Sequence, residues 1–454
     1  MITSPAFRGK RYAVLGLARS GLATVDALLA SGAEVTAWDS NEDARAKVAG
    51  KVALADPATI DLAGYDGVVV SPGVPLNRHP IAVHAAEAGV KVIGDIELFA
   101  QARASLPPHK VVGITGTNGK STTTALVHHI LKTAGVPTTM GGNIGLPILA
   151  QDPLPAGGVY VLELSSYQID LTFSLDCDVA VLLNITPDHL DRYEGFKAYG
   201  SSKRRLFEMQ SKRGIGIFND EDEEAWQILD QLEMGQWRYS GMAWSAPTKS
   251  LLDDPSMPIS MRGVNGGRGG RIQLDQSNWA SLQGPHNAQN ALAAVAVSEA
   301  LGLKVEPIES GLRTYPGLPH RMERVADKAG ILFVNDSKAT NPDSTAPALA
   351  AFPHVHWIVG GLAKGEDLGP CADQLGHVRA AYTIGEAGPM FARLLKGKVP
   401  VRESEVLARA VEDAAEAASP GEVVLLSPAC ASFDQFRDYE ARGEAFRAAV
   451  EALA

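Results

Sequence analysis

The stretch from Val111 to Ala125, VVGITGTNGKSTTTA, decides the fold of the chain around it. Its apolar run at 111–115 predicts a buried β-strand, the glycines that follow predict a tight turn, and Lys120 opens a helix. In a strand–loop–helix arrangement of this kind, backbone N–H groups and a helix N-terminus converge on phosphate. Lys120 would place a positive charge on the β- and γ-phosphates, and the Ser121 hydroxyl would bind Mg²⁺. The predicted triphosphate-binding residues are Gly116, Thr117, Asn118, Gly119, Lys120, Ser121 and Thr122.

This stretch departs at one position from the usual phosphate-binding pattern, G-x-x-x-x-G-K-[ST]. The first glycine of that pattern would stand at position 114, where this chain has Ile114. A chance glycine turn before a helix is the simpler alternative. The strand before the turn, the helix after it and the Lys-Ser-Thr in phase favour the phosphate site.

The totals describe an ordinary globular chain. Its 454 residues exceed what one hydrophobic core organises, so about two to four domains are expected. No apolar run reaches the ~18–20 residues of a membrane span, and the first residues lack the layout of a secretory signal. The formal net charge of −11 argues against a nucleic-acid partner. The cysteines (Cys177, Cys371 and Cys430) are far apart, which suits the cytoplasm and provides neither a disulfide framework nor a metal site.

The N-terminal region begins as a nucleotide-binding β-α-β unit. A strand at Tyr12–Gly16, a helix at Ser20–Ala30 and a strand ending in Asp39 are expected. The turn between the first two has Ala18 where the dinucleotide fingerprint has its second glycine, and Asp39 lies near the offset of a ribose-binding acid. A dehydrogenase domain is therefore an alternative for this region alone.

A third strand, Gly67–Val70, runs into Ser71-Pro72-Gly73. The carboxyl ends of parallel strands are where open α/β sheets bind ligands, although a plain turn explains this segment equally well.

The central region places further polar residues at strand ends. Glu163 ends a buried strand, and an acid in that position beside a phosphate loop can hold Mg²⁺, whereas an isolated acid is more often only solvated. His189 follows the strand that begins at Val179. On the next helix, Tyr199 and Lys203 share a face, although a solvated basic face is the simpler explanation for Lys203.

Two asparagines, Asn287 and Asn290, lie one turn apart at the start of an alanine-rich helix. Their amides suit an adenine or a phosphate, but capping of the helix N-terminus explains Asn287 almost as well.

Proline-containing linkers at Ala104–His109 and Tyr315–Pro319 separate three α/β domains, with boundaries expected at 1–106, 107–317 and 318–454. The first is expected to be Rossmann-like, the second to resemble a P-loop ATPase, and the third to be Rossmann-like with three candidate ligand loops at one sheet edge.

Several motifs together resemble the Mur ligases, the ATP-dependent amide-forming enzymes of peptidoglycan precursor synthesis. The central domain contains GTNGKST at Gly116–Thr122, LELSSYQ at Leu162–Gln168, NITPDHLDRY at Asn184–Tyr193 and GPHNAQN at Gly284–Asn290. The third domain contains LPHRMERV at Leu318–Val325, NDSKATNPDS at Asn335–Ser344, GGLAKGED at Gly360–Asp367 and LSPACASFDQF at Leu426–Phe436. The second set resembles the D-glutamate-adding branch of the family.

The resemblance implies a cytoplasmic ligase that joins D-glutamate to UDP-N-acetylmuramoyl-L-alanine. ATP would phosphorylate the alanine carboxylate, and the D-glutamate amine would attack the resulting acyl phosphate. It implies catalytic roles for Lys120, Glu163, His189 and Lys203, and two Mg²⁺ sites held by Ser121, Glu163, His189 and Lys203. Lys203 is expected to be carbamylated. No membrane partner is expected, and the chain is expected to be a monomer.

The resemblance also implies which residues bind each of the three ligands. ATP would contact Asn287, Asn290, Arg321 and Asp336 in addition to the phosphate loop. The UDP-linked substrate would contact Arg19, Ser20, Gly21, Asp39, Ser71, Pro72, Gly73, Asn143 and Ser165. D-Glutamate would contact Lys338, Thr340, Lys364, Ser432, Phe433 and Tyr439. A sister ligase for another amino acid and a nucleotide-sensing scaffold without turnover are the rival functions.

Overall fold

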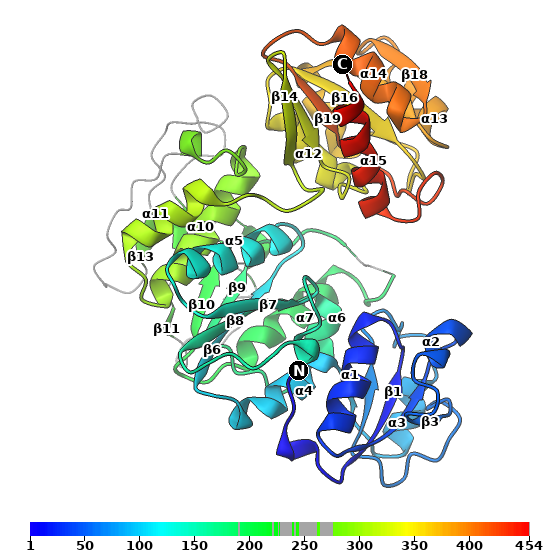
Figure 1. The fold of residues 1–454 in the computed structure, drawn as a ribbon, viewed down its shortest axis with the longest axis vertical. Coiled ribbons are helices and arrows are strands. Elements are labelled where there is room, and N and C mark those ends of the chain that lie inside the picture. The colour runs from blue at the N-terminus through cyan, green and yellow to red at the C-terminus, as the bar shows by residue number, and fades with distance from the viewer. Residues whose placement is uncertain are drawn as a thin grey trace. The chain divides into compact units, whose positions relative to one another are not determined.

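The computed structural model describes residues 1–188, 191–219, 222–225, 227 and 276–453, together with the strand segments 238–239, 242–244 and 261–263. Figure 1 shows three α/β sheets, each with helices of its own. Apart from one antiparallel edge strand in the third sheet and a separate two-stranded pair, all neighbouring strands are parallel. The predicted α/β class is confirmed.

The first sheet has the strand order β3-β2-β1-β4-β5. The central strand, β1, has β2 on one side and β4 on the other, so the strand order reverses there and the loops at their carboxyl ends diverge to leave room for a ligand. The elements are β1 (Arg11–Leu15), α1 (Arg19–Ala30), β2 (Glu34–Trp38), α2 (Glu42–Ala46), β3 (Ala53–Leu54), β4 (Gly67–Val70), α3 (Ile81–Glu87), β5 (Val92–Ile93) and α4 (Asp95–Ala102).

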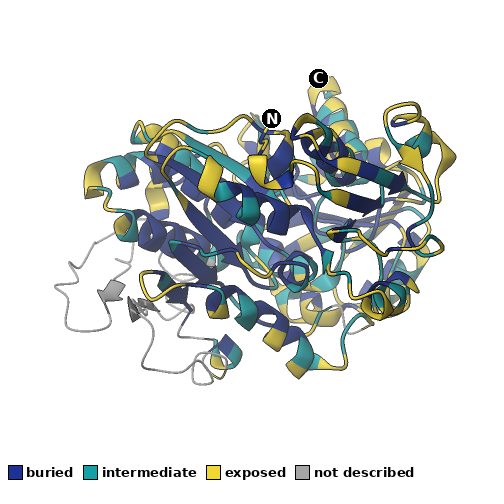
Figure 2. Cartoon of the chain, turned by 90° about the horizontal axis from the view of Figure 1, so that it is seen from below, coloured by how far each residue is buried: buried dark blue, intermediate teal, exposed yellow. Residues whose placement is uncertain are grey.

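The second sheet has the order β11-β10-β9-β6-β8-β7. Its centre is β6, the strand of the phosphate-binding stretch, with β9 and β8 beside it. These strands are buried over most of their length, as their continuous apolar sequences require, and Figure 2 shows in general that strands inside the sheets are buried. The elements are β6 (His109–Thr115), α5 (Lys120–Thr133), β7 (Thr138–Gly142), β8 (Gly158–Glu163), α6 (Ser166–Asp170), β9 (Val179–Leu182), α7 (Phe196–Glu208), β10 (Ile215–Phe218), β11 (Arg238–Tyr239), α10 (Pro285–Ala300) and α11 (Val305–Thr314), with the separate pair β12 (Met242–Trp244) and β13 (Met261–Gly263).

The third sheet has the order β14-β15-β19-β16-β17-β18, so that β15, β19 and β16 are neighbours. Three loops leave these adjacent parallel strands at one edge, as the sequence predicted. The elements are β14 (Glu323–Lys328), β15 (Ile331–Asn335), α12 (Pro342–Ala350), β16 (Val355–Gly360), β17 (Val378–Ile384), α13 (Gly388–Leu395), β18 (Val401–Glu405), α14 (Leu407–Ala417), β19 (Val423–Leu426) and α15 (Tyr439–Ala452).

The described residues divide into two compact units. The first contains those up to 244 with 261–263 and 290–311, and the second contains 276–289 and 312–453. The first two sheets share one hydrophobic core, which extends from Ile2 to Ala225. The third sheet has separate cores, one around Trp357 and one around Tyr382. No helix among the described residues has the length and apolar character needed to cross a membrane.

A buried carboxylate joins the first two sheets. Glu97 of α4 accepts hydrogen bonds from the amides of Phe173 and Ser174, at 2.7 and 2.9 Å, and from the Ser174 hydroxyl at 2.8 Å. Gln101 donates to it at 3.0 Å. Because Glu97 is only 4% exposed, these bonds replace the water that its charge would otherwise need.

Replacing Glu97 by alanine is expected to destabilise the junction of these sheets by about 3 kcal/mol, because it removes the common acceptor of several hydrogen bonds, and a hydrogen bond to a charged group contributes roughly 1.5–3 kcal/mol. Amide hydrogen exchange of residues 94–106 and 171–176 should become about 100-fold faster. The control is Glu87→Ala, at an exposed position on α3. Unchanged protection in the Glu97 variant would show that its hydrogen bonds contribute little.

Candidate active site

The phosphate loop lies between β6 and α5, as predicted. Gly116 and Gly119 have φ values of 150° and 84°, in the region that favours glycine. A Cβ added to Gly119 would lie 2.2 Å from Oδ1 of Asn290, so only glycine lets that side chain approach the loop. The structure therefore brings the predicted ATP contact Asn290 to the phosphate loop.

Lys120 points back over this loop. Its Nζ donates to the carbonyl oxygens of Gly116 and Thr117 at 3.0 and 2.8 Å, which holds the ammonium group at the N-terminus of α5. Ser121 and Thr122 are buried in the first turn of that helix. Positive charge and a helix N-terminus thus coincide, which is the arrangement that binds a polyphosphate.

The segment after β9 is hydrogen-bonded to the same loop. The Asn184 backbone accepts from the amide of Thr117 at 2.9 Å, and its side chain accepts from the amide of Asn118 at 2.8 Å and donates to the Asn118 carbonyl at 3.1 Å. Thr117 also exchanges two hydrogen bonds with the backbone of Thr186. Asn184 was given no role from the sequence, although it opens one of the quoted motifs. The predicted His189 lies outside the described residues.

Lys203 is buried, so the simpler explanation of a solvated basic face is wrong for this residue. Its Nζ donates to the Gly116 carbonyl at 2.9 Å and lies 4.5 Å from the centre of the Tyr199 ring. The Tyr199 hydroxyl in turn lies 3.1 Å from the Thr117 hydroxyl. Burial, and then the nearby charge of Lys120, lowers the pKa of Lys203 well below its ordinary value. The structure therefore brings this lysine to the phosphate loop.

Glu163 lies at the carboxyl end of β8 and is only 2% exposed. Its Oε1 accepts from the side-chain amide of Asn143 at 3.2 Å, which places the predicted substrate contact Asn143 beside it. Its Oε2 is buried without a hydrogen-bond partner among the described residues. Ser165, two positions on, caps α6 in a reciprocal arrangement with Gln168.

These residues fit the Mg²⁺ that the phosphate site implies. A buried carboxylate oxygen without a donor is costly alone and is the ligand that Mg²⁺ prefers, together with hydroxyl, water and phosphate oxygens. Glu163 and Ser121 supply such oxygens. Among the described residues, no group of three or more histidine, cysteine or acidic side chains is arranged to hold a metal ion, so any ion here would take most of its ligands from elsewhere, as Mg²⁺ commonly does.

The predicted UDP loops meet at the first sheet. Asp39 accepts from the amides of Leu17 and Asn41, at 2.6 and 2.9 Å, so both of its oxygens hold the backbone of these loops. The Ser71 hydroxyl donates to the Gly16 carbonyl at 3.0 Å. A Cβ on Gly21 would lie 1.9 Å from the same carbonyl, so α1 can pack here only with glycine. Pro72 and Gly73 continue the Ser71 loop, and Arg19 and Ser20 begin α1.

The third sheet carries the predicted D-glutamate residues on its adjacent loops. Lys338 and Thr340 follow β15, Lys364 follows β16, Ser432 and Phe433 follow β19, and Tyr439 begins α15. The ammonium of Lys338 lies 5.3 Å from the centre of the Tyr439 ring. Ser432 is buried, whereas Phe433 is 69% exposed. This edge therefore presents cations and hydroxyls, which suit a ligand with carboxylates.

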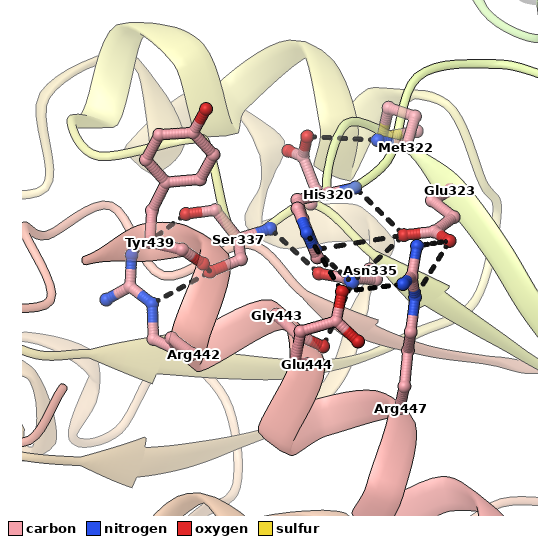
Figure 3. Close-up of polar contacts among 11 residues, drawn as sticks. His320, Met322, Glu323, Asn335, Ser337, Tyr439, Arg442, Gly443, Glu444 and Arg447 are labelled. Atoms are coloured by element: carbon pink, nitrogen blue, oxygen red, sulfur yellow. Dashed lines mark hydrogen bonds and ion pairs between the residues drawn. The ribbon is translucent and has the colours of Figure 1, made fainter. Parts of the chain in front are cut away.

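A buried arginine, which the sequence analysis missed, joins two of these loops. Arg442 of α15 donates to the hydroxyl and carbonyl of Ser337, at 3.0 and 2.9 Å, as Figure 3 shows. It also donates to the carbonyls of Cys430 and Ala431 at 3.0 and 3.3 Å. Burial lowers its pKa to about 10. An arginine inside an otherwise amphipathic helix gives no sequence signal of this role.

The backbone around Arg321 is fixed by the second network in Figure 3. The Asn335 side chain lies 3.0 Å from Nδ1 of His320 and donates to Glu323 at 3.1 Å. A Cβ on Gly443 would lie 2.0 Å from His320 Nδ1, so glycine is required where the histidine meets α15. The predicted ATP contact Arg321 directly follows this anchored histidine.

Asn287 and Asp336 complete the predicted ATP contacts. Asn287 lies within α10, and its side chain donates to the Gln283 carbonyl at 3.0 Å, so the capping explanation is wrong. Asp336 follows β15 and accepts from the Ser427 hydroxyl at 2.8 Å and from the Met322 amide at 3.1 Å. Burial raises the pKa of Asp336 to about 7.

Asp336→Asn is expected to reveal the cost of ionising this carboxyl. Because burial raises the folded-state pKa, the wild-type protein loses stability as the pH rises from about 4 to 7, by ~1.4 kcal/mol per pKa unit at most, and the neutral amide does not. Amide hydrogen exchange of β15 and β19 is measured for both proteins at pH 5 and at pH 8. The ratio of the variant's protection factor to that of the wild type should be larger at pH 8 than at pH 5. An equal ratio at both pH values would contradict the raised pKa.

Three family models match the chain. They are the Mur ligase MurD-like N-terminal domain over residues 10–94, the Mur ligase middle domain over 114–298, and the Mur ligase glutamate ligase domain over 320–430. The first of these removes the dehydrogenase alternative for the N-terminal region. Each matched range lies within one of the three predicted domains, whose boundaries stay predictions.

Curated relatives match along the whole chain. The UDP-N-acetylmuramoylalanine–D-glutamate ligase of Novosphingobium aromaticivorans is 60% identical, covering 100% of this chain and 97% of its own length. Those of Sphingopyxis alaskensis and Zymomonas mobilis are 58% and 55% identical, with 100% of both chains covered in each case.

Solved structures share the fold at much lower identity. UDP-N-acetylmuramate–alanine ligase MurC from Thermotoga maritima has a TM-score of 0.60 at 19% identity and covers 98% of this chain and 99% of its own. MurF ligase from the same organism, in complex with ADP, has a TM-score of 0.60 at 17% identity and covers 98% and 96%. The matched domains, the full-length relatives and this shared fold show that the chain belongs to the Mur ligase family.

Proposed function

We propose that this protein is an ATP-dependent ligase that forms an amide bond between the alanine carboxylate of UDP-N-acetylmuramoyl-L-alanine and the amine of D-glutamate. The observation that carries the proposal is the full-length identity of 55–60% to three ligases of that name. Peptidoglycan precursor synthesis is the pathway that the activity serves, and the cytoplasm, where ATP and UDP-linked sugars are made, is its location.

The phosphate loop would perform the first half of the reaction. Lys120, anchored over the loop by two carbonyls, would neutralise charge on the transferred phosphoryl group while the alanine carboxylate attacks it. An acyl phosphate forms and ADP leaves. The D-glutamate amine then attacks the acyl carbon, and phosphate departs from the tetrahedral intermediate. No protein nucleophile is required, because the energy of ATP is stored in the acyl phosphate.

Mg²⁺ would shield the negative charges of the phosphate and carboxylate oxygens that have to approach one another. Ser121 and the unpartnered oxygen of Glu163 would hold one ion. His189 and a carbamate on Lys203 would hold a second, and Lys203 is suited to carbamylation because a neutral buried amine can attack carbon dioxide.

The remaining residues would select the substrates. The loops of the first sheet that carry Ser71 and Asp39 would hold the UDP group, with Asn143 and Ser165 on the sugar–alanine portion. The cations Lys338 and Lys364 would bind the two carboxylates of D-glutamate, with Ser432 and Thr340 donating hydrogen bonds. Asn287, Asn290, Arg321 and Asp336 would contact ATP. The protein would act as a monomer of three domains divided at 106/107 and 317/318.

The test is phosphate release with ATP, Mg²⁺ and UDP-N-acetylmuramoyl-L-alanine, with D-glutamate added or withheld. Release that requires both substrates, with a product heavier by one glutamate residue, is the expected result. Release only with L-lysine or meso-diaminopimelate would assign a sister ligase. Binding of both nucleotides without any release would indicate a sensing scaffold instead.

A further inference from the structure

We propose that Arg192 is a positioning residue that couples binding of the UDP-linked substrate at the first sheet to the conformation of the phosphate loop at the second. The inference rests on the proposed function, which names the ligands of the two loops. Arg192 lies on the segment between β9 and α7. The sequence assigned it no role.

The guanidinium of Arg192 holds the loop that follows β4. Its Nη2 donates to the Val74 carbonyl at 2.9 Å and lies 3.5 Å from the Pro72 carbonyl, while Nη1 lies 3.5 Å from the Gly73 carbonyl. One planar side chain thus meets three consecutive backbone acceptors, which a point charge could not do. The same loop is bonded through Ser71 to the turn between β1 and α1, so Arg192 restrains both predicted UDP loops.

Two side chains between β4 and α3 also donate hydrogen bonds to the segment that carries Arg192. The Asn77 side chain and the Arg78 guanidinium both donate to the carbonyl of Asp191, at 3.0 and 3.2 Å. Asp191, the residue before Arg192, therefore accepts hydrogen bonds from the chain after β4, whereas Arg192 donates hydrogen bonds to it. Movement of either loop would have to break contacts on both chain segments.

A continuous row of aromatic rings leads from Arg192 to the phosphate loop. The guanidinium carbon lies 4.4 Å from the centre of the Tyr167 ring, and that ring stacks on Tyr193 with 6.0 Å between centres and 13° between planes. The Tyr193 ring lies 5.5 Å from that of Tyr199, whose hydroxyl is 3.1 Å from the hydroxyl of Thr117 in the phosphate loop.

The middle ring of this row is held in one arrangement by a hydrogen bond. The Tyr193 hydroxyl donates to Asp170 at 2.7 Å, so the ring cannot shift without breaking a charge-assisted bond. Packed side chains have discrete arrangements, and a ligand that favours one arrangement at one end favours it at the other. Arg192 is the contact that connects the UDP loop to this row.

The experiment measures coupling between two ligands on the full chain, without turnover. Calorimetry gives the Kd for UDP-N-acetylmuramoyl-L-alanine with and without Mg²⁺ and a non-hydrolysable ATP analogue. In the wild type, the analogue is expected to tighten substrate binding about tenfold, within the ~5–150-fold that coupled sites show. In Arg192→Met, that factor should fall to within about twofold of unity, while the analogue alone binds with wild-type affinity. Arg192→Lys should give an intermediate factor, because lysine keeps the charge but not the planar fork.

The control is Arg11→Met. Arg11 also lies over a tyrosine, 4.6 Å from the centre of the Tyr65 ring, but at the start of β1, the end remote from the ligand loops. It should retain the wild-type factor.

Three results would overturn the coupling role. These are no coupling in the wild type, wild-type coupling in Arg192→Met, and a loss of affinity for each ligand alone that matches a fall in thermal stability. If the methionine variant does not fold, wild-type coupling in Arg192→Lys overturns it equally. Failure of the wild type to bind the UDP-linked substrate at all would instead overturn the proposed function.

Discussion

Lys120→Ala is expected to lower kcat for phosphate release by about 10²–10³-fold, the usual loss when one group that stabilises transition-state charge is removed. The ammonium is held by the Gly116 and Thr117 carbonyls at the N-terminus of α5. The side chain is therefore already ordered before ATP binds, so little conformational entropy is lost on binding. During transfer, negative charge develops on the leaving oxygen of ADP and is spread over the equatorial oxygens of the phosphoryl group. The loss should therefore fall mainly on kcat, with a smaller rise in KM for ATP.

The measurement is steady-state release of ADP and phosphate at saturating substrates. Lys132→Ala is the matched control, because Lys132 lies exposed in the last turn of the same helix. It should keep wild-type kinetics. A Lys120 variant within threefold of wild-type kcat would mean that the phosphate loop does not work through this charge, and the helix N-terminus and Mg²⁺ would have to account for the catalysis.

The sequence was informative where a residue's position follows from local pattern. The apolar runs that form β6 and β8 are bounded by glycines or acids, and parallel strands bring their carboxyl ends to one edge, so the positions of Lys120 and Glu163 at that edge were predictable. Spacing was less informative about what a side chain contacts. Asp39 stands where a ribose-binding acid is expected, yet both of its oxygens hold backbone amides of its own loops.

Contacts between distant segments were beyond local pattern. The helical spacing of Tyr199 and Lys203 was visible, but the run Lys203-Arg204-Arg205 favours a solvated face, and only the packing of α7 against the phosphate loop buries Lys203. Arg192 and Arg442 resemble ordinary surface arginines in sequence. Their partners are backbone carbonyls, 118 residues away for Val74 and 12 residues away for Cys430. Every residue has such a carbonyl, so the sequence gives no signal for these contacts.

Lys203→Ala is expected to lower kcat by at least about 100-fold, and small carboxylic acids are expected to restore part of the activity. Burial and Lys120 lower the pKa of Lys203, which favours the neutral amine, and the neutral amine is the form that would attack carbon dioxide, forming an N–C bond and releasing a proton. The proposed carbamate would carry a negative charge at the end of a long side chain. Alanine removes both the amine and that charge, which leaves a space near the Gly116 carbonyl.

The rescue distinguishes an anion from an ammonium at this position. Acetate or propionate, added to the alanine variant, would restore a carboxylate where the carbamate stood, whereas methylammonium would restore the cation of an unmodified lysine. We expect rescue by the acids alone, and a carbamate carbon signal near Lys203 when the wild type is equilibrated with ¹³C-bicarbonate and absent from the variant. Lys197→Ala, at an exposed position on the same helix, should lose no activity and respond to neither compound. Rescue by methylammonium, or a wild type without the ¹³C signal, would make Lys203 a buried cation that acts through the phosphate loop, and the second metal position would then lose the ligand on which it depends.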